Sequence, residues 1–252
     1  MSDTQGNFVW CELDTSDVNG AIKFYKDVVG WGTQAFDENY SIVTAGETGV
    51  GGVTRLSDEH KKIGLGPHWL GYVSADDVDA LTKKAESLGA KTHVPPTDIP
   101  TIGRFSLIAD PQAAVIALFK PLPRDTPPPP AEPTKGHFVW HELIAADHES
   151  ALRFYSELFG WQKTDAFQGP MGTYQMYGKA GRTFGGMMTK PKGYPAPPHW
   201  LYYVTVADLD AALARVKKND GKVWNGPMDI PGGERVAQCV DPQGAAFALH
   251  GK

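Results

Sequence analysis

Two glutamates lie inside otherwise apolar strand sequences, and both are candidates for acid–base chemistry. Glu12 and Glu142 stand among Trp, Val and Leu side chains, where an unpaired carboxylate is costly. Apolar surroundings raise the pKa of a carboxyl group, and a carboxylate with a raised pKa could serve as a general base. Both glutamates are therefore candidate catalytic residues. Arg104 and Arg235 each follow an Asp-Ile-Pro turn. Each arginine either pairs with a glutamate or binds an anionic ligand through its guanidinium fork.

These residues come in pairs because the chain is duplicated. Gly6-Asn-Phe-Val-Trp-Cys-Glu-Leu13 returns 130 residues later as Gly136-His-Phe-Val-Trp-His-Glu-Leu143. Four further blocks recur in the same order at an offset of 130 or 131: Phe24-Tyr25 with Gly30-Trp31, Pro67-His68-Trp69-Leu70, Asp98-Ile-Pro100 and Asp110-Pro-Gln112. The period is too long for a solenoid, so we expect two whole domains, residues 1–120 and 136–252. Residues 121–135 are rich in proline and are predicted to form a semi-rigid linker.

Each copy is predicted to contain two βαβββ modules, giving four in the chain. In the first module, residues 8–13 alternate as a strand does, and residues 17–29 have helical apolar spacing that ends at Gly30. Short strands are expected at 33–37, 40–45 and 50–55. In the second, a strand at 68–74 and a helix at 77–88 precede strands near 91–94, 104–109 and 114–119. The pairs Gly51-Gly52 and Gly185-Gly186 are predicted to be bulges or points of close approach.

This order of elements resembles the vicinal oxygen chelate superfamily. The resemblance rests on the Phe-Tyr helix ending in Gly-Trp, the strand His68-Trp-Leu-Gly-Tyr-Val73 and the terminal Asp110-Pro-Gln112. The superfamily includes glyoxalase I, bleomycin-resistance proteins, fosfomycin-resistance enzymes and extradiol dioxygenases. It implies an α+β fold of two tandem domains, each a pair of βαβββ modules forming a half-open mixed β-barrel with helices outside. Its members bind a divalent metal on the concave face, where the metal polarises two neighbouring substrate oxygens.

The resemblance also places candidate metal ligands, and several are missing. His68 and His199 match the family's histidine on the fifth strand. The glutamate of the eighth strand is replaced in both copies, by Ala117-Leu118 and Ala248-Leu249. Trp10 and Trp140 fall near the first-strand ligand, two residues before the glutamates. The fourth strands hold neither carboxylate nor histidine.

A complete four-ligand site is therefore not expected in either copy. A fallback set in the second copy is Glu142, His199 and His250, since two histidines and a carboxylate suit Fe(II), Zn or Mn. We expect the cofactor to be a divalent metal (Fe, Zn, Mn or Ni) or none.

Strand alternation predicts which aromatic side chains line the concave pockets. Counting from His68, Tyr72 faces the concavity and Trp69 faces the helices, so Trp69 and Trp200 are expected in the core. His141 has the parity of the helix-facing side, and a packing role is favoured. The predicted ligand-binding residues are Trp10, Tyr72, Arg104, Trp140, Tyr203 and Arg235.

Composition excludes several other classes of protein. The net charge is −5 and no cluster of Lys or Arg is present, which argues against nucleic acid. No apolar run reaches the roughly 18 residues of a membrane span, and no export signal is recognised, so a cytoplasmic protein is expected. A monomer and a homodimer are equally compatible with the sequence.

Three functions follow from these patterns. The first is a protein that binds a small organic molecule in aromatic-lined pockets without an obligatory metal. The second is a metal-dependent glyoxalase-like lyase or dioxygenase with a rearranged site. The third is a metal-free enzyme that uses Glu12 or Glu142 as a base.

Overall fold

The computed structural model describes residues 4–58, 61, 65–123, 134–169 and 171–252. Most of the predicted proline-rich linker at 121–135 lies outside the described residues, so its expected semi-rigid, extended conformation stays a prediction. None of the helices in the described part of the chain is long and apolar enough to cross a membrane.

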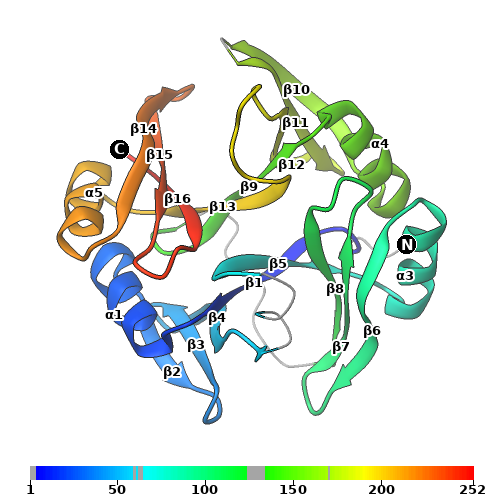
Figure 1. Ribbon diagram of the computed structural model, residues 1–252, viewed down its shortest axis with the longest axis horizontal. Coiled ribbons are helices and arrows are strands. Elements are labelled where there is room, and N and C mark those ends of the chain that lie inside the picture. The colour runs from blue at the N-terminus through cyan, green and yellow to red at the C-terminus, as the bar shows by residue number, and fades with distance from the viewer. Residues whose placement is uncertain (1–3, 59–60, 62–64, 124–133, 170) are drawn as a thin grey trace. The chain divides into compact units, whose positions relative to one another are not determined.

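The four expected βαβββ modules are present (Figure 1). The first repeat contains β1 (Phe8–Thr15), α1 (Val18–Val29), β2 (Gly32–Ala35), β3 (Tyr40–Ala45), β4 (Thr48–Arg55), β5 (His68–Ser74), α3 (Val78–Ser87), β6 (Lys91–Ile99), β7 (Gly103–Ala109) and β8 (Val115–Pro121). The second contains β9 (Phe138–Ala145), α4 (His148–Phe159), β10 (Gln162–Gly169), β11 (Gly172–Lys179), β12 (Arg182–Thr189), β13 (His199–Thr205), α5 (Leu209–Lys218), β14 (Lys222–Ile230), β15 (Glu234–Val240) and β16 (Ala246–Gly251).

Each repeat contributes one eight-stranded mixed sheet. The strand orders are β2-β3-β4-β1-β5-β8-β7-β6 and β10-β11-β12-β9-β13-β16-β15-β14. The hairpin strands pair antiparallel, whereas β1 with β4 and β5 with β8 pair parallel, as do their counterparts in the second repeat. The α+β class and the tandem repeat of paired modules are thereby confirmed.

Local sequence signals fix where the helices begin and end. An aspartate precedes each of the helices α1, α3, α4 and α5. It accepts a hydrogen bond from a backbone N–H of the first turn, which satisfies a donor that has no partner within the helix. The helices α1 and α4 end at Gly30 and Gly160, whose φ angles of 87° and 79° are in the left-handed region. The predicted C-cap at Gly30 is confirmed.

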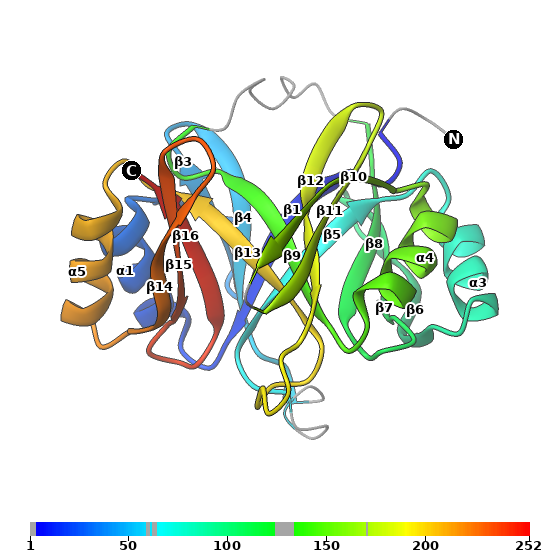
Figure 2. The same cartoon turned by 90° about the horizontal axis from the view of Figure 1, so that it is seen from above.

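The described chain forms two compact units, and each unit combines modules from both repeats. One contains residues within Met1–Val9, Gly71–Pro128 and Trp140–Trp200, and the other contains Trp10–Leu70, residues within Pro129–Val139 and Leu201–Lys252. Accordingly α3 lies beside α4 in the first unit, and α1 lies beside α5 in the second (Figures 1 and 2). The boundaries 1–120, 121–135 and 136–252 remain a prediction from the repeat.

Within each unit, the motifs that define the repeat contact each other across the two copies. The Tyr25 hydroxyl on α1 donates to Asp241 Oδ2 at 3.1 Å and accepts from Trp69 Nε1 at 2.9 Å. In the other unit, the corresponding Tyr155, Asp110 and Trp200 make the same bonds at 3.0 and 3.3 Å. Trp69 and Trp200 are each 5% exposed, which confirms that they belong to the core.

Substituting Tyr155 with Phe should therefore lower the free energy of unfolding by about 2 kcal/mol. The change removes one hydroxyl and leaves two buried polar groups, Asp110 Oδ2 and Trp200 Nε1, without that partner. Urea unfolding monitored by circular dichroism measures the effect. Tyr25→Phe should cost a similar amount, and an unchanged midpoint in both variants would show that the hydroxyls are not structural.

Candidate functional site

A pair of matching aromatic clusters occupies corresponding strands of the two repeats. Trp10 on β1 donates its Nε1–H to the hydroxyl of Tyr40 on β3 at 2.9 Å. Trp140 on β9 donates in the same way to Tyr174 on β11 at 2.8 Å. All four rings are half-buried, so each cluster keeps part of its aromatic surface accessible.

Each cluster also contains the strand glutamate that the sequence singled out. Burial first, and then the charge and hydrogen bond of the Glu12 carboxylate, raise the pKa of Tyr40 far above its usual value. The Tyr40 hydroxyl therefore stays protonated and donates to Glu12. Glu142 is 4% exposed. Burial, followed by the charge of Glu142, raises the pKa of Tyr194 to about 12.

A glycine on the neighbouring strand makes room for each tyrosine. Glu12 is in register with Gly52 of β4, and Glu142 with Gly186 of β12. A Cβ atom at Gly52 would lie 1.9 Å from the Tyr40 hydroxyl oxygen, and one at Gly186 would lie 2.1 Å from Tyr174 Cε1. The prediction of close approach at these glycines is confirmed. We name Trp10, Glu12, Tyr40 and Gly52 the first cluster, and Trp140, Glu142, Tyr174 and Gly186 the second cluster.

The two candidate histidine ligands are held in one tautomer but have different neighbours. The Nδ1 atoms of His68 and His199 lie 2.9 and 2.8 Å from the backbone carbonyl oxygens of Gly66 and Pro197. Because a carbonyl oxygen can only accept, Nδ1 carries the hydrogen in both rings and the Nε2 lone pair is the remaining acceptor of the neutral form.

In the first repeat, His68 Nε2 lies 3.7 Å from Oδ2 of the buried Asp14. The corresponding residue of the second repeat is Ile144. There, Tyr194 stacks on His199 with ring centroids 6.0 Å apart, and burial lowers the pKa of His199. The two repeats thus differ in charge around their histidines.

Among the described residues, no three His, Cys, Asp or Glu side chains form a group that could hold a metal ion. His250 Nε2 forms an ion pair with Glu234 Oε2 at 2.9 Å. On the eighth strands, Ala117 and Ala248 are in register with Tyr72 and Tyr203, and neither alanine offers a donor atom. The metal roles of His68, His199, Glu142 and His250 remain predictions.

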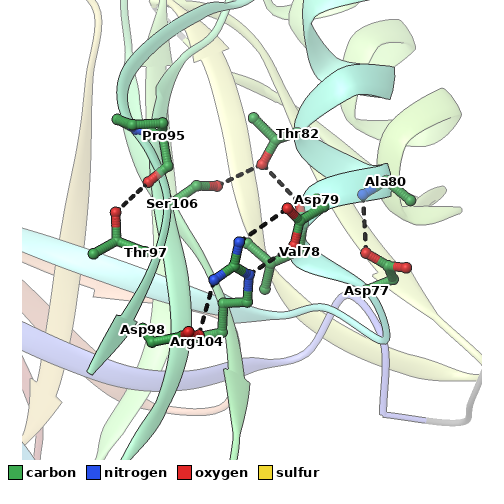
Figure 3. A network of polar contacts seen from close by, with 10 residues as sticks. All are labelled: Asp77, Val78, Asp79, Ala80, Thr82, Pro95, Thr97, Asp98, Arg104 and Ser106. Atoms are coloured by element: carbon green, nitrogen blue, oxygen red, sulfur yellow. Dashed lines mark hydrogen bonds and ion pairs between the residues drawn. The ribbon is translucent and has the colours of Figure 1, made fainter. Parts of the chain in front are cut away.

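The two arginines bind aspartates, which the sequence does not indicate as their partners. Arg104 donates to both carboxylate oxygens of Asp79, in the first turn of α3, at 2.7 and 3.0 Å, and to Asp98 of β6 at 2.8 Å (Figure 3). Arg235 binds both oxygens of Asp210 at 3.1 and 2.8 Å. The expected ligand-binding role of both arginines stays a prediction. In the structure their guanidinium groups bind aspartates of α3 and α5 and so connect each helix to the neighbouring β-hairpin.

The remaining predicted residues are buried in local contacts. Tyr72 packs edge-on against Phe119, and Tyr203 accepts a hydrogen bond from Gln238 Nε2 at 3.1 Å. His141 is buried and stacks on Phe8 with ring centroids 3.8 Å apart and planes 6° apart. The predicted packing role of His141 is confirmed, while ligand binding by Tyr72 and Tyr203 remains a prediction.

Four residues near the candidate site escaped sequence reasoning: Asp14, Tyr40, Tyr174 and Tyr194. Asp14 shares the strand parity of Glu12, which is a signal that could have found it. Tyr40 and Tyr174 lie 134 residues apart rather than 130 or 131, so the comparison of blocks at a fixed offset did not pair them.

Comparison with known proteins is consistent with this architecture. The model of the Glyoxalase/Bleomycin resistance protein/Dioxygenase superfamily matches residues 7–118 and 125–249. The putative glyoxylase CFP32 of Mycobacterium tuberculosis is 32% identical over 97% of this chain and 94% of its own length. The anthracycline biosynthesis protein DnrV of Streptomyces peucetius is 27% identical over 95% of this chain and 91% of its own length.

Solved structures share the fold at low sequence identity. The Mn(II)-bound glyoxalase from Novosphingobium aromaticivorans is 17% identical, with a TM-score of 0.63 over 98% of this chain and 82% of that chain. The 2,2',3-trihydroxybiphenyl 1,2-dioxygenase from Sphingomonas wittichii strain RW1 is 15% identical, with a TM-score of 0.68 over 100% and 91%. The chain belongs to the Glyoxalase/Bleomycin resistance protein/Dioxygenase superfamily.

Proposed function

We propose that this protein binds a small organic molecule at each of its two clusters and that binding needs no metal. The observation that carries the proposal is the repetition of one constellation, a tryptophan bonded to a tyrosine beside a strand glutamate, in both repeats. Each constellation is built within a single compact unit. Side chains that merely cover a strand surface need not be the same in two copies of a domain. Here the Trp–Tyr pair and the glycine that leaves room for the tyrosine occur in both repeats.

The chemistry of the clusters suits a ligand with an apolar ring and a hydrogen-bond donor. The half-buried Trp and Tyr rings offer aromatic faces and edges for stacking. A carboxylate has about four acceptor positions, so Glu12 can accept from a ligand hydroxyl or amine while it accepts from Tyr40. The name of the Streptomyces relative, an anthracycline biosynthesis protein, supports a small organic ligand.

Purified protein should bind 2-naphthol whether or not a chelator is present. Titration calorimetry in EDTA is expected to give the same affinity as titration without it. Replacing Trp10 and Trp140 with Leu should weaken binding about tenfold, which corresponds to the loss of one aromatic contact per site. Trp224 is an exposed tryptophan on β14 outside both clusters, so Trp224→Leu is the control and should leave the affinity unchanged. Stoichiometric tightly bound metal whose removal abolishes binding would contradict the proposal.

A metal-dependent glyoxalase-like lyase or dioxygenase, with a rearranged site in the second repeat, is the second candidate. It is favoured by the orientation of His199, whose Nδ1–H is fixed by the Pro197 carbonyl so that Nε2 is left as the acceptor, as in many metal-binding histidines. Under this candidate, His199→Ala and Glu142→Ala should each abolish uptake of Mn(II) or Fe(II), measured by elemental analysis. Unchanged uptake in both variants would exclude it.

A further inference from the structure

We infer that Phe36 and Phe167 extend the two clusters outward, and that they select for an elongated, fused-ring aromatic ligand. The inference rests on the proposed function and names its ligand class. It concerns two side chains that the fold itself does not explain, because each is exposed on an edge hairpin.

Both phenylalanines expose an unusual amount of apolar surface. Phe36 is 50% exposed and Phe167 is 56% exposed, which places them among the few large apolar side chains of the described residues that face solvent. Phe36 follows β2 and Phe167 belongs to β10, the strands at the matching edges of the two sheets. Exposed edges of sheets usually carry charged residues or proline, so an aromatic ring at this place in both repeats calls for a separate reason.

Each phenylalanine is a close backbone neighbour of the tyrosine of its cluster. The Phe36 N–H donates to the Tyr40 carbonyl oxygen at 3.0 Å, and the two rings meet edge to face with centroids 6.0 Å apart. Phe167 is in register with Tyr174 in the antiparallel pair β10–β11. Directly opposed residues of an antiparallel pair point to the same face of the sheet, so the phenylalanine lies on the face that carries the cluster.

Each repeat therefore presents three aromatic rings in a row from inside to edge: Trp10, Tyr40 and Phe36 in the first, Trp140, Tyr174 and Phe167 in the second. The glutamate stands at the inner end of each row, in register with the glycine that admits the tyrosine. A single ring fills only the inner part of such a row. A ligand of several fused rings, with a hydroxyl or amine directed at the glutamate, would use all three.

A series of aromatic alcohols of increasing length tests the inference. Phenol, 2-naphthol and 2-anthrol carry the same hydroxyl on one, two and three fused rings. Full-length protein should bind 2-anthrol about tenfold more tightly than 2-naphthol, since an aromatic contact adds roughly this factor. In Phe36→Ala/Phe167→Ala that gain should disappear while the affinity for phenol stays unchanged. Phe36→Tyr/Phe167→Tyr should retain it, and Trp224→Ala should have no effect.

The outcomes separate this inference from the proposed function. If the Trp10→Leu/Trp140→Leu variant loses affinity for every alcohol while Phe36→Ala/Phe167→Ala binds 2-anthrol as tightly as the parent protein, the inference is overturned and the proposed function stands. If the parent protein binds none of the three alcohols, both are overturned. Because both phenylalanines are largely exposed, their removal should leave the thermal midpoint unchanged, and this is checked first.

Discussion

Lowering the pH from 6.5 to 4 should reduce the free energy of unfolding by about 3 kcal/mol through His141 alone. Burial lowers the pKa of His141 from its ordinary 6.5 to about 4, and nearby Arg182 adds to the shift. The hydrogen bond to the Phe184 carbonyl opposes it, because it would favour the protonated ring. The side chain is buried against Phe8, so water screens its charge little.

The direction of this change in stability depends on whether the folded or the unfolded chain binds the proton. Between pH 6.5 and 4 the unfolded chain has a protonated histidine at position 141, whereas the folded chain keeps it neutral. Protonation therefore favours the unfolded state, and stability falls as the pH falls through this window, by roughly 1.4 kcal/mol per pH unit. Above pH 6.5 and below pH 4 the contribution of this side chain no longer changes.

His141→Cys is a matched control because Cys11 occupies the same position in the first repeat. Urea unfolding at a series of pH values should show a smaller loss of stability in the variant, by about 3 kcal/mol over the window. The lowered pKa of His199 also makes the protein less stable as the pH falls. Burial raises the pKa values of Asp110 and Asp241, and these two groups make the protein more stable as the pH falls. The difference between parent and variant cancels these groups, and parallel curves would contradict the role of His141.

The fold was predictable because its signals are local and repeated. Gly30 ends α1 in a left-handed conformation that glycine adopts without strain, and an aspartate before α1, α3, α4 and α5 accepts a hydrogen bond from the first turn. Strand parity from His68 correctly placed Trp69 in the core, because a strand alternates regardless of its partners. The pairing of Tyr25 with Asp241 could not be predicted, since no local pattern says which copies of two identical motifs meet.

The candidate site was predictable only in part. The two glutamates could be identified because a carboxylate in an apolar strand is unusual. Tyr40, the partner of Glu12, lies on a hairpin whose length differs between the copies, and Tyr194, which interacts with Glu142, lies on the segment before β13. Asp14 has no counterpart in the second repeat, where Ile144 takes its place, so the similarity between the repeats does not reveal it. The partner of Arg104 depends on how α3 packs against the β6–β7 hairpin, which is a tertiary feature.

Replacing Gly52 with Ala should cost about 2 to 3 kcal/mol and disable the first cluster. The new Cβ would lie 1.9 Å from the Tyr40 hydroxyl oxygen and 2.3 Å from Cζ, so the ring must leave its position beside Trp10 and Glu12. Crowding of this size in a packed site typically costs 1 to 3 kcal/mol, and the displaced hydroxyl also loses its hydrogen bonds. Gly186→Ala should act in the same way on Tyr174.

A double-mutant cycle distinguishes this steric cause from a general intolerance of alanine in β4. In a Tyr40→Ala background the methyl group of Gly52→Ala has no ring to displace, so the second substitution should cost about 1 kcal/mol or less. Gly66→Ala is the neutral control, because a Cβ there has no atom within 4 Å. Equal costs in both backgrounds would mean that Gly52 is required by the strand rather than by the tyrosine. The glycines at positions 52 and 186 would then be a requirement of the two strands and would not support a ligand-binding cluster beside either of them.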